Sequence, residues 1–103
     1  MFKINNFDWG IKKVSPNHPK LKKEDGTYAL GSCDVNTKLI YISELVPYYK
    51  LKKVLCHEIT HAAMFSYNVK MDIAQEEIMA DLIATYGNEI IEITNKIFSR
   101  ITE

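Results

Sequence analysis

The segment from residue 47 to residue 67 is PYYKLKKVLCHEITHAAMFSY, which contains no glycine and has proline only at its first position. Helices tolerate a proline there. Apolar residues recur along the segment at steps of three and four, namely Leu51, Val54, Leu55, Ile59, Ala62 and Phe65. Such steps place these residues on one face, so we predict an amphipathic helix over 47–67 with that face on a core.

Residues 57–61 of this helix are HEITH, an H-E-x-x-H motif. Its two histidines are four residues apart and share a helical face, so both imidazoles can reach one metal ion at about 2.0–2.1 Å. The glutamate between them can reach a water molecule on that ion. It can accept a proton as the water attacks a carbonyl, because the ion lowers the pKa of the water toward about 7. The motif therefore predicts His57 and His61 as zinc ligands and Glu58 as the general base.

A catalytic zinc site also needs a third protein ligand and an open position for water. We predict a second helical region over 73–101, with three acids in its first turns. Glu77 and Asp81 share a face, so we predict Glu77 as the third ligand and Asp81 as the acceptor of the outer N–H of a ligand histidine. Glu76 lies about 100° away around the helix and is expected to face solvent. Acids in a first turn also stabilise a helix N-terminus, which is the alternative explanation for these residues.

The length of the second helical region depends on Gly87. A glycine at this point either caps the helix or lets it continue more weakly. A row of isoleucines, Ile90, Ile93, Ile97 and Ile101, would form an apolar face on the continued helix. Both outcomes are compatible with the sequence.

The first 43 residues have the pattern of strands and turns. A loosely alternating segment, 7–14, precedes a loop with two prolines. The β-rich segments 27–33 and 38–43 are separated by four residues, which predicts a β-hairpin. Strands followed by helices predict one α+β domain over 1–103 with a small antiparallel β-sheet. A substrate peptide could pair with 38–43 as an edge strand, unless the lysine of that strand blunts the edge.

Composition excludes several classes of function. The 103 residues carry 13 basic and 13 acidic side chains, which gives no bulk electrostatic case for binding nucleic acid or a membrane surface. No apolar run approaches the roughly 20 residues that span a bilayer, and the start, MFKINNFDWG, lacks the pattern of a signal peptide. Cys33 and Cys56 are too few for a disulfide scaffold and are expected to be reduced thiols. We therefore expect a cytoplasmic protein without a nucleic-acid partner.

The paired motifs resemble a known family. HEITH at 57–61, followed sixteen residues later by EIMAD at 77–81, resembles the gluzincin arrangement of H-E-x-x-H and a following E-x-x-x-D. The short interval is most similar to the small ImmA/IrrE-type metallopeptidases of phages, mobile elements and their bacterial hosts. The segments GSCD at 31–34 and IYIS at 40–43 also look like the hairpin before the active-site helix in that family. The resemblance covers residues 27–86.

This resemblance implies a minimal zincin-like domain, in which the sheet is followed by an active-site helix and a second, ligand-bearing helix. It implies zinc-dependent endopeptidase activity with one zinc ion per chain, and in some family members the cleavage or control of a transcriptional repressor. By position, the zinc ligands are His57, His61 and Glu77, the general base is Glu58, and Asp81 is the acid behind a ligand.

Two other interpretations fit the same residues. In the first, the protein is a catalytically inactive, zinc-stabilised binding module that holds a partner against its sheet edge. In the second, it is a metal-free structural domain in which HEITH is a coincidence. Tyr67 and His18 are candidates to stabilise an oxyanion, but packing is the favoured explanation for the tyrosine and an exposed loop for the histidine, so we leave both out of the predicted site.

Overall fold

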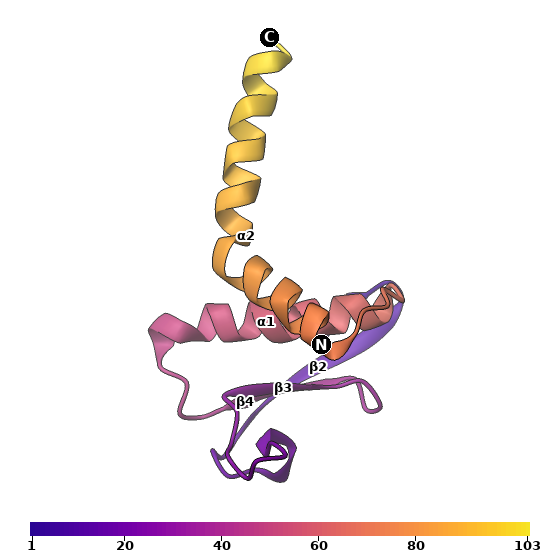
Figure 1. The fold of residues 1–103 in the computed structure, drawn as a ribbon, viewed down its shortest axis with the longest axis vertical. Coiled ribbons are helices and arrows are strands. Elements are labelled where there is room, and N and C mark those ends of the chain that lie inside the picture. Colours follow the sequence, from indigo (N-terminus) through magenta and orange to yellow (C-terminus); the bar gives the residue numbers. More distant parts are fainter.

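Four strands precede two long helices in this chain, which a computed structural model describes from Met1 to Glu103 (Figure 1). The elements in order are β1 (Phe2–Ile4), β2 (Phe7–Val14), the short 3-10 helix η1 (Pro19–Leu21), β3 (Gly31–Asp34), β4 (Leu39–Ser43), α1 (Tyr48–Ser66) and α2 (Ile73–Ile101). The prediction of a small α+β domain is confirmed. Neither helix combines the length and hydropathy that crossing a membrane requires.

The sheet is mixed, with the strand order β1-β2-β4-β3. The predicted hairpin is present, because β3 and β4 pair antiparallel, as do β1 and β2, but its first strand spans residues 31–34 and not 27–33. However, β2 and β4 pair in parallel, with Gly10 opposite Leu39, so the prediction of a wholly antiparallel sheet is wrong. The long connection over residues 15–30 allows this arrangement, because it carries the chain across the sheet before the hairpin forms.

The position of β4 also corrects the expected edge strand. The strand predicted at 38–43 lies inside the sheet between β2 and β3, and the edges are β1 and β3. The sequence prediction also omitted β1. Asn5 and Asn6 have φ of 46° and 72°, which is the left-handed backbone of a tight two-residue hairpin turn, and asparagine tolerates this conformation. This Asn-Asn pair was the available signal for β1.

Both helices begin close to their predicted starts. The second is capped by Asp72, whose carboxylate accepts a hydrogen bond of 2.7 Å from the backbone N–H of Gln75, while the Gln75 side chain accepts one from the backbone of Asp72. Gly87 continues α2 instead of capping it, since Gly26 alone among the glycines has a positive φ. The longer of the two alternatives for α2 is therefore the observed one.

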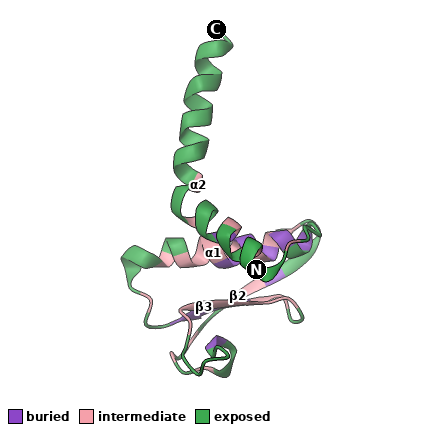
Figure 2. Ribbon diagram, in the orientation of Figure 1, coloured by how far each residue is buried: buried purple, intermediate pink, exposed green.

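The core is a thin layer between the sheet and α1 (Figure 2). Trp9 of β2 is fully buried beside Ile40, Ile42 and Ala62. Its indole N–H donates a hydrogen bond of 2.9 Å to the hydroxyl oxygen of Ser66, which ties β2 to the end of α1. Since buried aromatic side chains supply much of a small core, this pair fixes how α1 lies on the sheet.

Candidate metal centre

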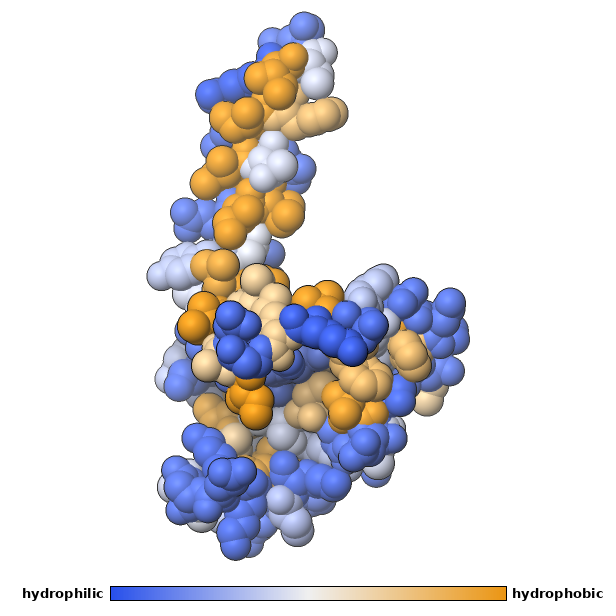
Figure 3. All heavy atoms as spheres, turned by 45° about the vertical axis from the view of Figure 1, so that its right-hand side comes forward, coloured by the Kyte–Doolittle hydropathy of each residue, from blue (hydrophilic) through white to orange (hydrophobic).

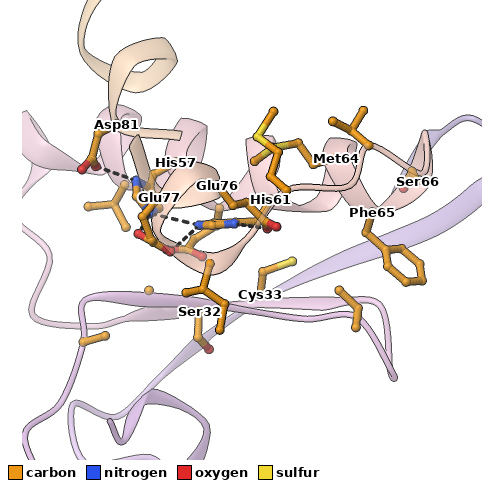
Figure 4. Close-up of a pocket in the computed structure, with 18 of the residues that line it drawn as sticks. Ser32, Cys33, His57, His61, Met64, Phe65, Ser66, Glu76, Glu77 and Asp81 are labelled. Atoms are coloured by element: carbon orange, nitrogen blue, oxygen red, sulfur yellow. Dashed lines mark hydrogen bonds and ion pairs between the residues drawn. The ribbon is translucent and has the colours of Figure 1, made fainter. Parts of the chain in front are cut away.

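Three predicted ligands converge where the first turns of α2 cross the middle of α1 (Figure 4). The Nε2 atoms of His57 and His61 are 3.2 Å apart. One carboxylate oxygen of Glu77 lies 3.1 Å from Nε2 of His57, and the other lies 2.9 Å from Nε2 of His61. The two helices thus bring two nitrogen ligands and one oxygen ligand to a single point.

The outer nitrogens of the two histidines each contact a carboxylate. Nδ1 of His57 is 3.0 Å from Asp81, and Nδ1 of His61 is 2.7 Å from Glu76. An ionised carboxylate only accepts hydrogen bonds, so these contacts suit the tautomer with a proton on each Nδ1, which is the tautomer that leaves each Nε2 free to bind a metal ion. Such carboxylate–histidine pairs orient metal-binding imidazoles and raise their basicity.

This donor set fits a metal ion. Two ligands at about 2.0–2.1 Å from a tetrahedral zinc ion lie about 3.3–3.4 Å from each other, close to the separations among His57, His61 and Glu77. In the tautomer with a proton on each Nδ1, the three groups present lone pairs to one another at about 3 Å, an arrangement that a metal ion between them would stabilise. Glu77 is exposed, so water has access to the remaining side of the site.

Glu76 corrects one sequence prediction. It was expected to face solvent, but its side chain is only 31% exposed and contacts His61. The reason is the crossing of the helices: adjacent residues of α2 contact opposite nitrogens of the His61 ring, Glu77 at Nε2 in the centre and Glu76 at the outer Nδ1. The sequence did contain a signal for Glu76. Two ligand histidines need two acceptors for their outer N–H groups, and Asp81 can serve only His57.

Glu58 is buried between α1 and the edge strand β3. Burial raises the pKa of its carboxyl group, and the neighbouring His57 and His61 partly offset this effect. A Cβ atom at Gly31 would lie 3.1 Å from Cγ and 3.2 Å from Oε2 of Glu58, so the absent side chain of Gly31 leaves the space that this carboxylate occupies. The sequence prediction missed this contact because the two residues are distant in the chain.

A cleft of about 1450 Å³ opens over these groups. Its lining includes the two histidines, Glu58 and the acids of α2, together with residues 31–33 of β3. Cys33 lies on its floor (Figure 4), where burial raises the pKa of the thiol to about 12 and the charge of Glu58 adds to the increase. This thiol is therefore protonated at neutral pH in the metal-free protein.

The two candidates for oxyanion stabilisation lie outside this cleft. Tyr67 is exposed at the end of α1. His18 caps η1, where Nδ1 accepts a hydrogen bond of 3.1 Å from the backbone N–H of Lys20, and its ring stacks on Tyr41. Local packing and capping account for His18 without a catalytic role.

In comparisons with known proteins, no family model, no curated protein and no solved structure matches this chain. The resemblance of residues 57–61 and 77–81 to gluzincins therefore stays a prediction that depends on the motifs themselves.

Proposed function

We propose that this protein is a zinc-dependent endopeptidase with a zincin-like active site, in which Glu58 is the general base. The observation that carries the proposal is the convergence of His57, His61 and Glu77 at 2.9–3.2 Å beside a buried carboxylate in an open cleft. A purely structural metal site would be closed by four protein ligands, whereas catalytic zinc sites have three and an open position.

Each side chain of the site has a distinct task. His57, His61 and Glu77 would hold one zinc ion, which supplies a lowered pKa for water and polarisation of a carbonyl. Glu58 accepts a proton from the attacking water and delivers it to the amine nitrogen that leaves. Its raised pKa suits both halves of this transfer. Asp81 acts behind His57 by holding the proton on Nδ1.

The free edge of β3 supports an extended peptide as the substrate. The backbone N–H of Ser43 donates to the carbonyl of Leu30, so residues 30, 32 and 34 bond inward to β4. The N–H and C=O groups of Gly31 and Cys33 therefore point away from the sheet, along the cleft. A peptide strand bound there would gain backbone hydrogen bonds with little demand on its sequence.

The substrate class and the cellular location are further parts of the proposal. The family resemblance favours a regulatory protein as the substrate, and the balanced charge favours no nucleic-acid partner. Cys33 and Cys56 are both free, which supports the cytoplasmic location that we propose.

Replacing Glu58 tests the proposal directly. Zinc-loaded protein should cleave an unstructured protein substrate, such as fluorescein-labelled casein. The variant Glu58→Gln should lower kcat by about 10²–10⁴-fold while keeping one zinc ion per chain. Glu77→Ala should lose both the activity and the zinc ion. Undiminished cleavage by Glu58→Gln would contradict the role of the base.

The inactive binding module gives a different result in the same assay. The free β3 edge supports that alternative equally, since it would hold a peptide whether or not the peptide is cut. Stable peptide binding by zinc-loaded protein, without products and unaffected by Glu58→Gln, would replace the peptidase proposal with this one.

A further inference from the structure

The C-terminal half of α2 extends away from the rest of the molecule (Figure 1). All residues from 88 to 103 are exposed, and the projection makes the molecule 53 Å long but only 30 Å and 28 Å across. An isolated helix of fewer than about 12–15 residues is marginal in water. This half of α2 continues from the packed first half but lacks the tertiary contacts that supply most helical stability in proteins.

One side of this projecting half is apolar. We call it the C-terminal stripe, and it consists of Ile90, Ile91, Ile93, Ile97, Phe98 and Ile101. Each of these residues is 46–75% exposed, and apolar atoms follow the projection in Figure 3. Ile83, Ile90 and Ile97 are spaced by seven residues, which is the repeat of helices that pack along one another.

The stripe continues into a groove at its base. Where α2 leaves the body, a cavity of about 620 Å³ lies between the two helices. Its walls include Tyr49 and Lys52 of α1, and Ile83, Gly87 and Ile90 of α2. The uncovered apolar surface thus extends from the body of the domain to the end of the chain.

The charges beside the stripe indicate what covers it. Residues 88–103 carry three acids and two bases, which does not favour an anionic lipid surface. Glu89, Lys96 and Arg100 lie within about 40° of one another around the helix, on one flank, with the acid first and the bases last. The opposite flank has the uncharged Asn88 and Asn95.

This order of charges is complementary to itself. In an antiparallel pair related by a two-fold axis, each flank faces the same flank of the other copy in reverse. Glu89 then faces Lys96 and Arg100 of the second copy, and the contact occurs twice. A parallel pair would instead set the charged flank against the asparagines. We propose that a second copy of this chain covers the C-terminal stripe, forming an antiparallel α2–α2 homodimer.

The same arrangement accounts for the groove. If the axis passes near Thr94, midway between the charges that pair, the last residues of one copy lie opposite the base of α2 in the other. Glu103 then approaches Lys52 at the groove wall, and Ile101 approaches Gly87. The stripe and the groove are both filled by one two-fold contact, and the metal-ligand cluster takes no part in it.

The mass of the full chain in solution tests the proposal. Sedimentation of the intact protein at 1–100 μM should give twice the chain mass of 11.9 kDa. Ile90→Asp with Ile97→Asp should weaken the dimer about a hundredfold or more, whereas Leu45→Asp, at an exposed loop position, should leave it unchanged. Unchanged zinc content and melting of the body would show that each variant is folded.

Charge exchange and cross-linking test the antiparallel order. Glu89→Lys alone should weaken the dimer about tenfold, and adding Lys96→Glu and Arg100→Glu should restore it. With Cys33 and Cys56 replaced by serine, Thr94→Cys should cross-link two copies, and Ile101→Cys should not. A monomer at 100 μM, or equal cross-linking at both positions, would overturn the proposal.

Discussion

Among individual residues, Glu76 offers the sharpest test of how the site is built. It contacts His61 and no other ligand, so Glu76→Ala should free that imidazole to rotate and lower zinc affinity about 10–100-fold. Glu76→Gln keeps an oxygen that can accept the hydrogen bond, so it should lose less zinc affinity than Glu76→Ala. Competition with a chromophoric chelator measures both values, with Glu92→Gln as a control on the same helix. Equal affinity in Glu76→Ala and the unaltered protein would remove Glu76 from the site.

Gly31 should control the position of the general base without touching the metal. Gly31→Ala adds a Cβ atom about 3 Å from both Val54 and Glu58, so the carboxylate of Glu58 must shift. The carboxylate must move by a few tenths of an ångström. Since a displacement of about 1 Å can cost up to 10²-fold in rate, kcat should fall about threefold while the zinc content stays the same. Gly87→Ala meets its nearest neighbour at 3.4 Å and should leave kcat unchanged. Unaltered kcat in Gly31→Ala would show that the carboxylate tolerates the shift.

These two residues show why the sequence predicted only part of the site. The ligands His57 and His61 follow from the helical period, and Glu77 follows from the need for a third ligand on the next helix. Glu76 depends on the angle at which two helices cross, and Gly31 on a contact between distant segments. Neither property is present in local spacing.

At the level of the elements, the outward N–H of Cys33 on β3 is the proposed anchor for a substrate strand. Cys33→Pro removes that N–H, and prolines are tolerated at such positions on edge strands. Losing one backbone hydrogen bond should raise KM about tenfold and leave the zinc content unchanged. Cys33→Ala keeps the N–H and is the matched control. If both variants have the same KM, substrate does not pair with this edge.

The contact between η1 and β3 gives the chain a defined response to acid. Nζ of Lys20 donates a hydrogen bond of 2.8 Å to Asp34, which is the main cause that lowers the pKa of Asp34 to about 2. Because this pKa is below the ordinary value of 3.8, the stabilisation is complete above that value and is lost as the pH falls toward 2. Lys20→Met should therefore melt at a lower temperature than the unaltered chain at pH 6, and the gap should shrink steeply between pH 4 and pH 2. An undiminished gap at pH 2 would assign the effect to packing.

The elements themselves were predictable to different degrees. Helix α1 and the start of α2 were placed almost to the residue, because apolar spacing and the acids of the first turn are local signals. The hairpin of β3 and β4 was predicted for the same reason. The parallel pairing of β2 with β4 depends on a connection of residues 15–30 that carries no periodic pattern, so the strand order was not predictable.

For the molecule as a whole, stability and the metal site are closely linked. Only 12 of the 103 residues are buried, and apart from Ala80 none of these belongs to α2. The N-terminal half of α2 contacts α1 through the buried Ala80 and through the cluster of His57, His61 and the acids facing them. A metal ion at that point would therefore hold the second helix to the rest of the domain.

Removing the metal should accordingly lower the melting temperature. A ligand at 100 times its dissociation constant stabilises a protein by about 2.7 kcal/mol, which corresponds to about 10–20 °C for a domain of this size. Calorimetry of zinc-loaded protein with and without EDTA measures the shift, and Glu77→Ala should melt at the same temperature in both buffers because its site is incomplete. A melting temperature that EDTA leaves unchanged in the zinc-loaded chain would mean that α2 is held to α1 by packing alone, and the metal-free interpretation of HEITH would then be the correct one.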